Sequence, residues 1–164
     1  MPRMKQAPKI CLILDNVRSA HNVGSALRTA DAVGVERIYL CGVTPLPIDR
    51  FGRPRADIAK VALGAERSVL WEHAPDCIAL LLKLKRRHYN VLALEQHSRS
   101  VDYRAARFKG VVALVVGNEP DGLPAEILAV ADTIIEIPMR GDKESLNVSV
   151  ALGVALYELT RQYM

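Results

Sequence analysis

The feature that most constrains the fold is an alternation of short apolar runs with amphipathic stretches along the chain. The apolar runs are KICLIL, RIYLC, SVLWEH, NVLALEQ, GVVALVVGN and DTIIEIP, at residues 9–14, 37–41, 68–73, 90–96, 110–118 and 132–138. Apolar runs of this length are typical of strands buried on both faces. The stretches between and after them predict helices over residues 23–33, 54–66, 75–87, 124–131 and 148–159. This alternation predicts an α/β fold with a mostly parallel sheet and helices on both faces.

Length and composition indicate one domain over residues 1–164. Half of the residues are hydrophobic and 24% are charged, as in globular proteins. The start of the chain is basic and then apolar, but its apolar run, ICLIL, ends at Asp15. We therefore predict a first strand after a short basic arm (residues 1–9) rather than a signal peptide. No apolar run approaches the ~20 residues of a membrane span, so we expect no membrane partner.

The cysteines and histidines indicate neither a disulfide framework nor a metal site. Cys11, Cys41 and Cys77 are far apart and lack C-x-x-C spacing, which favours buried thiols in a reduced, cytoplasmic protein. The four histidines are scattered, without the spacing of metal ligands. The net charge of +4 includes basic clusters at residues 83–90, 99–109 and 50–55. Each cluster alone is explained by a solvated surface, whereas the three together favour nucleic acid, though weakly.

Three segments that follow apolar runs carry unusual polar residues: residues 15–30, 117–124 and 137–147. In parallel α/β sheets, ligands bind in the loops at the carboxyl ends of the strands. Gly117 to Gly122 has the G-x-x-x-x-G spacing of a phosphate-binding loop but continues with Leu123 and Pro124 instead of Lys and Ser or Thr. The segment instead predicts a tight glycine turn that presents Glu119 and Asp121, either for function or simply to solvent.

The other two segments each combine a possible helix cap with a further polar residue. Asn22 can cap the helix that follows it, and Arg28, beside apolar neighbours, is either directed to solvent or held for an anion. Ser145 is a candidate N-cap of the last helix. Capping by Ser145 does not explain Asn147, which we place inside the first turn, where asparagine is a poor helix former.

These segments resemble the three motifs of the SpoU/TrmH branch of the SPOUT RNA methyltransferases. N-x-G-x-x-x-R-T-A at residues 22–30 resembles the first motif, and V-V-G-N-E-x-x-G-L at residues 115–123 resembles the second. The third, I-P-M-x-G-x-x-x-S-L-N-V-S-V-A at residues 137–151, is long and specific. Their order and their strand-loop-helix placement also agree, and the resemblance spans nearly the whole chain.

The resemblance implies an α/β domain whose C-terminal part forms a deep trefoil knot, a rare exception to unknotted chains. It also implies a homodimer that binds S-adenosylmethionine (SAM) in the knot and methylates a ribose 2′-hydroxyl of RNA. The apolar remainder of the last helix, residues 148–159, would then pack against the sheet on one side and the partner subunit on the other.

The resemblance also assigns roles to individual residues. Arg28 would be the catalytic arginine and Asn22 its motif partner, Glu119 the acid of the second motif, and Ser145 and Asn147 the polar pair of the third. The cofactor pocket would be formed by Leu94, Gly117, Ile137, Met139 and Leu146. In the second motif, Pro120 and Asp121 stand where many relatives have other residues.

The implied chemistry is an in-line methyl transfer that needs no metal and no covalent enzyme intermediate. The protein must align the acceptor oxygen, exclude water and help the hydroxyl lose its proton. Guanidinium groups, with pKa above ~12, are poor proton acceptors at neutral pH. We therefore hypothesise that Arg28 holds a phosphate and stabilises the developing alkoxide.

The sequence leaves the RNA and part of the reaction open. The dimer surface and the arm with Arg3, Lys5 and Lys9 would hold the RNA, with transfer RNA favoured and ribosomal RNA possible. The alternatives are a SPOUT enzyme that methylates a base nitrogen, a non-catalytic RNA-binding dimer, and an unrelated doubly wound nucleotide-binding enzyme.

Overall fold

The computed structural model describes residues 9–162, and its centre is one parallel seven-stranded sheet. The strand order is β3-β2-β1-β6-β4-β7-β5, and every neighbouring pair is parallel. The strands are β1 (Ile10–Asp15), β2 (Arg37–Cys41), β3 (Trp71–Ala74), β4 (Asn90–Leu94), β5 (Val101–Asp102), β6 (Val112–Val116) and β7 (Thr133–Glu136). The predicted basic arm lies outside the described residues, apart from Lys9.

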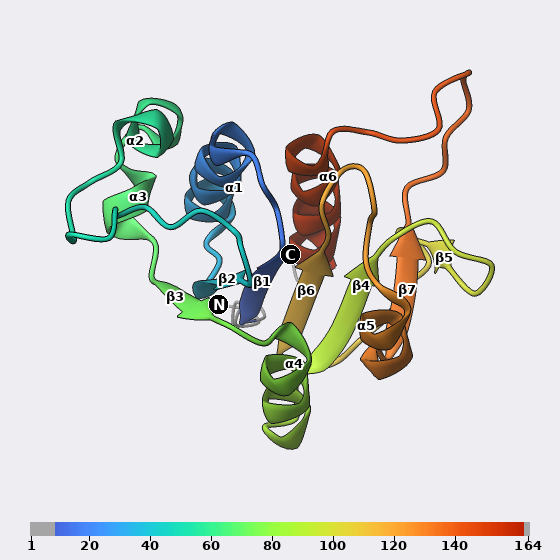
Figure 1. Ribbon diagram of the computed structural model, residues 1–164. Helices are drawn as coiled ribbons and strands as arrows, with labels where there is room; N and C mark the ends of the chain where they lie inside the picture. The colour runs from blue at the N-terminus through green and yellow to red at the C-terminus, as the bar shows by residue number, and fades with distance from the viewer. Residues whose placement is uncertain (1–8, 163–164) are drawn as a thin grey trace, which may run out of the picture.

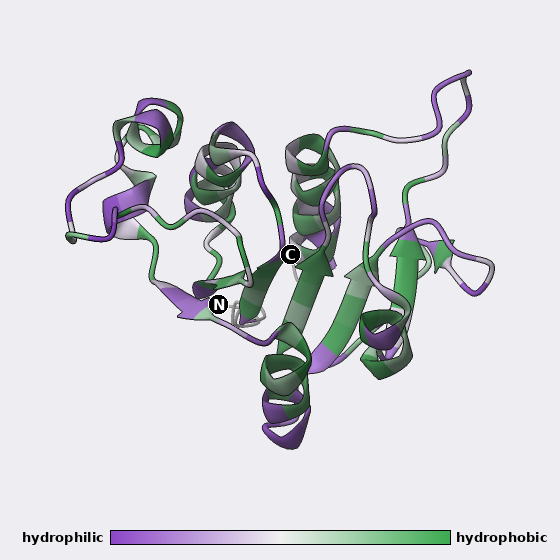
Figure 2. Cartoon of the chain, viewed as in Figure 1, coloured by the Kyte–Doolittle hydropathy of each residue, from purple (hydrophilic) through white to green (hydrophobic). Residues whose placement is uncertain are grey.

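Helices cover both faces of the sheet, as the sequence predicts (Figure 1). One face carries α1 (Ala20–Val33), α2 (Ala56–Ala62), α3 (Ala65–Ser68) and α6 (Val148–Arg161); the other carries α4 (Cys77–Arg86) and α5 (Ala125–Val130). Successive residues of β1 enter opposite cores because side chains alternate along a strand. Leu12 packs in the core beneath α1 and α6, and Ile13 in the core with α4 and α5. Figure 2 shows the central strands as hydrophobic along their length, between helices with hydrophilic outer faces.

Two regions differ from the predicted elements. The helix expected over residues 54–66 is broken at Leu63 and Gly64, whose φ angles are +53° and +98°. The residues after the break form the short helix α3, so that the strand expected at residues 68–73 begins only at Trp71. The edge strand β5 was not predicted, because two residues are too few to show a periodicity.

The topology places the three polar segments at one edge of the sheet. After β1 the chain builds β2 and β3 on one side, and it then crosses to build the remaining strands on the other. The strands β1, β6, β4 and β7 are therefore direct neighbours, and their carboxyl ends point the same way. Ligands bind at such a switch point in open parallel sheets.

Within residues 9–162 no helix is both long and apolar enough to cross a lipid bilayer.

Candidate active site

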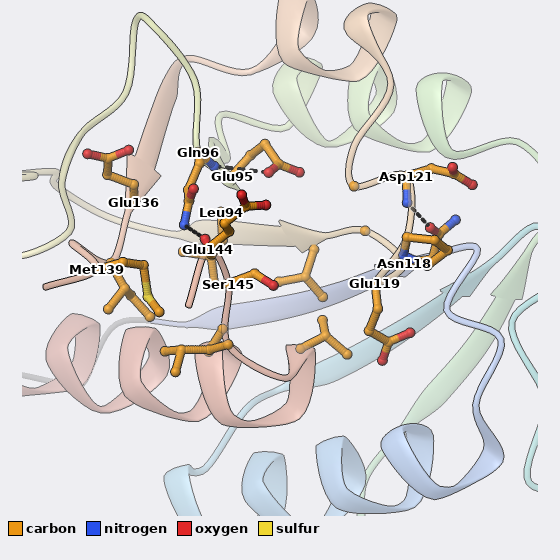
Figure 3. Close-up of a pocket in the computed structure, with 18 residues that line it drawn as sticks. Leu94, Glu95, Gln96, Asn118, Glu119, Asp121, Glu136, Met139, Glu144 and Ser145 are labelled. Carbon is orange, nitrogen blue, oxygen red and sulfur yellow. Dashed lines mark hydrogen bonds between the residues drawn. The ribbon is translucent and has the colours of Figure 1, made fainter. Parts of the chain in front are cut away.

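A pocket of about 370 Å³ opens where β4, β6 and β7 end, beside the first turn of α6 (Figure 3). This volume lies within the range of small-molecule sites, ~300–1,000 Å³. All five predicted cofactor-binding residues line it: Leu94, Gly117, Ile137, Met139 and Leu146. Of the predicted catalytic residues, Glu119 and Ser145 line it, whereas Arg28, Asn22 and Asn147 do not.

The glycine turn at residues 117–122 leaves no room for a side chain at its first position. A Cβ atom on Gly117 would lie 2.5 Å from the carbonyl group of Gly122 and 2.8 Å from the amide nitrogen of Leu123. The turn is closed by an antiparallel bridge between Asn118 and Gly122. The Asn118 Oδ1 also accepts a hydrogen bond from the amide of Asp121 at 2.9 Å. The predicted tight turn is thus observed.

Glu95 and Gln96, directly after Leu94, connect the two loops that form the pocket. The Glu95 carboxylate accepts a hydrogen bond from the amide of Leu123 at 2.8 Å, at the end of the glycine turn. The Gln96 side-chain amide donates to the backbone carbonyl of Glu144 at 2.6 Å, in the loop before α6. Figure 3 shows Gln96 and Glu144 facing each other at the pocket wall. We did not predict either residue as functional; their position after an apolar strand was the available indication.

A network of side-chain amides joins the three motif segments. Asn22 is only 6% exposed, and its Nδ2 donates to the carboxylate of Glu119. The Oδ1 of Asn22 accepts a hydrogen bond from the Nδ2 of Asn147 at 3.2 Å. These residues are 97 and 125 positions apart from Asn22 in the sequence. Figure 3 shows Glu119 pointing away from Glu95 and Gln96, towards the side on which α1 lies.

Both predicted helix caps are wrong. The N-cap of α1 is Ser19, whose hydroxyl accepts a hydrogen bond from the amide of Asn22 at 3.2 Å; Asn22 lies inside the first turn. The N-cap of α6 is Asn147 rather than Ser145, and its Oδ1 accepts from the amide of Ser149 at 2.9 Å. Asparagine is favoured at this position, so Asn147 both starts the helix and joins the amide network.

Arg28 and Ser145 make no hydrogen bond or ion pair with any other described residue. Arg28 is exposed, while its neighbours Ala26, Leu27 and Ala30 are buried, which agrees with a side chain directed to solvent or to an anion. It lies six residues after Asn22, or ~9 Å along the helix axis. The exposed hydroxyl of Ser145 faces the pocket.

The pocket is electrostatically one-sided. Its lining contains five carboxylates, and the described residues contribute no Lys, Arg or His to it. The carboxylates belong to Glu95, Glu119, Asp121, Glu136 and Glu144. Such a lining favours a ligand with positive charge and disfavours a nucleoside triphosphate.

Cys11, Cys41 and Cys77 are buried free thiols, as predicted. Cys77 lies close to Asp15, a buried carboxyl at the end of β1. Burial raises the pKa of Asp15, and a hydrogen bond with the Cys77 thiol partly opposes this rise. Among residues 9–162 no group of three His, Cys, Asp or Glu side chains is arranged to hold a metal ion.

The fold is a parallel α/β domain with a pocket at the carboxyl ends of β4, β6 and β7, the edge at which such domains bind ligands. The chain belongs to the SpoU rRNA Methylase family, whose sequence profile matches residues 9–157. This confirms the resemblance found in the motifs and excludes the unrelated doubly wound enzyme.

Two curated relatives show the same similarity over almost the whole chain. The 23S rRNA (guanosine-2′-O-)-methyltransferase RlmB of Ralstonia nicotianae is 38% identical over 157 residues, which cover 96% of this chain and 60% of the relative. The tRNA (guanosine(18)-2′-O)-methyltransferase of Aquifex aeolicus is 35% identical over 158 residues, which cover 96% of this chain and 72% of the relative. The chain thus spans about three fifths of the length of the first of these proteins.

Solved structures agree with the fold. An AdoMet-bound rRNA methyltransferase from Sinorhizobium meliloti superposes with a TM-score of 0.86 and 30% identity, over 98% of this chain and 59% of that one. A structure described as giving insights into 2-OH methylation of C/U34 on tRNA has a TM-score of 0.78 and 31% identity. In that case the match covers 94% of this chain and 96% of the other.

Proposed function

We propose that this protein is a SAM-dependent methyltransferase that acts on a ribose 2′-hydroxyl of RNA. The observation that carries the proposal is the amide network that joins Asn22, Glu119 and Asn147 beside an acidic pocket. The names of the relatives, which methylate guanosine 2′-hydroxyls of rRNA and tRNA, support the reaction and the substrate class.

The pocket residues fit SAM. SAM carries a sulfonium and an ammonium against one carboxylate, and its net positive charge suits the acidic lining. Leu94, Ile137 and Leu146 offer apolar surfaces for an adenine ring. The absence of a side chain at Gly117 lets backbone groups approach a ligand closely. When bound, SAM supplies an electrophilic methyl group.

The predicted catalytic residues, of which Glu119 and Ser145 line the pocket, are suited to position the RNA. Glu119, held by Asn22, fixes the second motif against the start of α1, and Asn147 fixes the start of α6 against the same amide. Arg28 is free among the described residues to hold a phosphate of the RNA chain and to stabilise the developing alkoxide. The Ser145 hydroxyl is free to bind the acceptor ribose or the cofactor.

We include the trefoil knot in the proposal. The last strand, β7, lies between β4 and β5 and therefore enters a connection that the chain made earlier. The preceding helix α5 covers one face of the sheet and the following helix α6 covers the other. The hydrogen bond between Gln96 and Glu144 joins the connection after β4 to the segment before α6. This path supports a threaded C-terminal part.

We also include a homodimer formed through α6. One face of this helix packs against α1 and the sheet, while Val150 and Tyr157 remain 51% and 57% exposed on its outer side. These two positions, seven residues apart, share one helix face. The molar mass from light scattering after size exclusion should correspond to two chains, and a stable monomer at micromolar concentration would contradict this part.

The buried free thiols support a cytoplasmic location.

Among RNA substrates we favour transfer RNA. The solved structure described by 2-OH methylation of C/U34 on tRNA is 31% identical to this chain, and the relative from Aquifex aeolicus is named for a tRNA guanosine; both support a tRNA substrate. The relative named as a 23S rRNA enzyme makes rRNA the second candidate.

The test combines cofactor binding with product identification. Calorimetry should show SAM binding, and its absence would remove both the ribose-methylating and the base-methylating hypotheses. Mass spectrometry of nucleosides from tRNA and rRNA incubated with labelled SAM should show a 2′-O-methylated nucleoside. A methylated base would identify a base-modifying SPOUT enzyme, and RNA binding without any product would identify a non-catalytic RNA-binding dimer.

A further inference from the structure

The loop between β2 and α2 presents an aromatic side chain to solvent between two arginines. Phe51 is 65% exposed. The guanidinium carbons of Arg50 and Arg53 lie 4.6 Å and 4.9 Å from the centre of its ring, within the range of cation–π contacts. With Leu46, Ile48, Asp49 and Arg55, these residues line an open hollow of about 550 Å³. The hollow is separate from the candidate active site.

Asp49 holds this loop in a fixed shape. Its Oδ1 accepts hydrogen bonds from the amides of Phe51 and Arg53 at 2.8 Å and 2.9 Å, and its Oδ2 binds the Arg53 guanidinium at 2.9 Å. These hydrogen bonds, first that from the Arg53 amide, lower the pKa of Asp49. Gly52 supplies the positive φ, +75°, that the turn requires. The loop backbone is therefore fixed with Phe51 outside the core, so that binding need not order the loop.

The charges of the loop leave one cation free. Arg53 pairs with Asp49 and Arg55 pairs with Asp57 at 2.6 Å, whereas Arg50 has no carboxylate partner in the described part of the chain. A planar base can replace the Arg50 guanidinium on the Phe51 ring, and Arg50, which has no carboxylate partner among the described residues, can then bind a phosphate. A protein ligand would use the ring but would have no equal need for the uncompensated cation.

We propose that residues 46–55, here the Phe51 loop, form a second RNA contact that stacks an unpaired nucleobase on Phe51 and binds its phosphate through Arg50. The inference rests on the proposed function, because it assumes an RNA substrate. The loop follows β2, so it leaves the same edge of the sheet as the candidate active site, but it projects from the side opposite β5 (Figure 1). The contact therefore strengthens RNA binding but does not touch the ribose that reacts in the active site of the same protein chain.

The test measures binding of the full chain to two probes, a labelled U15 oligonucleotide and a fully paired RNA duplex of equal length, by fluorescence anisotropy. Because stacking of a base on an aromatic ring is lost, Phe51→Ala should weaken U15 binding by about 5- to 150-fold. Phe51→Trp should retain the affinity. Leu82→Ala, which truncates a residue 43% exposed on α4 at the opposite face of the sheet, is the matched control and should change neither. Duplex binding should change little in all variants.

Two further measurements separate stacking from general loss of charge or fold. Arg50→Gln should reduce the slope of log K against log salt by about 0.7 for U15, the value for one phosphate contact with a single strand. The thermal midpoint and the SAM affinity of Phe51→Ala should equal those of the wild type. The fluorescence of Phe51→Trp should be quenched by U15 more strongly than that of the wild type, whose single tryptophan is Trp71.

The outcomes distinguish the two proposals. If the wild type binds U15 and Phe51→Ala binds it equally well, the second RNA contact is refuted while the proposed function stands. If Phe51→Ala loses U15 and duplex equally, the loop binds backbone rather than a base, and the stacking contact is refuted. If the wild type binds neither SAM nor RNA, the proposed function and the inference that rests on it both fail.

Discussion

Replacing Gly117 by alanine tests whether the glycine turn sets the shape of the pocket. The added Cβ would lie 2.5 Å from the carbonyl carbon and the carbonyl oxygen of Gly122, which are both backbone atoms. Non-bonded carbon atoms prefer ~3.5–4.0 Å, so the turn must move by roughly 1 Å. No flexible side chain can absorb this movement. The displaced segment also carries Glu119, which contacts Asn22.

The expected magnitude follows from the cost of overpacking, ~1–3 kcal/mol for an extra methyl group in a well-packed site. For a chain of this length such a cost lowers the thermal midpoint by ~2–4 °C per kcal/mol. If the turn instead shifts and distorts the pocket, the same free energy is lost from SAM binding, and the Kd for SAM rises by about 5- to 150-fold. Calorimetry with SAM and thermal unfolding of the same variant measure both effects.

Gly141→Ala is the matched control. It makes the same chemical change in the loop before α6, where an added Cβ has no neighbour within 4 Å. Neither glycine has a positive φ, so the two variants differ in steric contacts rather than in backbone strain. The steric reasoning is refuted if Gly117→Ala has the stability and the SAM affinity of the wild type. It is also refuted if Gly117→Ala and Gly141→Ala lose stability or SAM affinity equally.

Three further predictions concern single side chains. Glu95→Ala removes the acceptor of the Leu123 amide and should weaken SAM binding by about tenfold or more, since hydrogen bonds to charged groups contribute ~1.5–3 kcal/mol. The control is Glu144→Ala, which removes a carboxylate of the same pocket whose side chain has no hydrogen bond to any other described residue. Equal losses of SAM affinity in the two variants would show that only the charge matters. Asp15→Asn tests the raised pKa of a carboxyl that is 4% exposed. The folded wild type prefers the neutral carboxyl, so its stability falls as pH rises above the ordinary pKa of 3.8. The asparagine variant has no carboxyl to ionise and does not lose stability in this way. The thermal midpoint of Asp15→Asn relative to wild type should therefore rise between pH 4 and pH 7, and a constant difference would contradict this. Arg28→Lys keeps the positive charge but removes the planar fork of N–H donors, and it should lower kcat/KM by about 10- to 150-fold. Full activity with a new ionisation near ~10.4 would instead favour base catalysis by this side chain.

The sequence was sufficient for the layered fold because burial on two faces leaves a local pattern. The runs that became β1, β2, β4, β6 and β7 are apolar over their length, and amphipathic helices separate them. The polar segments after β1, β6 and β7 were also evident, since parallel strands place their carboxyl ends at one edge. The elements that sequence patterns missed are short, such as β5, or interrupted, such as the helix broken at Gly64.

The sequence by itself thus determined the α/β layers and the edge that carries the pocket, and the family resemblance of its motifs pointed to five residues that line the cavity. Only the tertiary structure decided how the polar side chains are used. Ser19 and Asn147, rather than Asn22 and Ser145, cap the two helices, and Asn22 joins residues 97 and 125 positions away. The physical reason is that burial is recorded in local periodicity, whereas a hydrogen bond depends on which distant donor and acceptor the folded chain brings within ~3 Å.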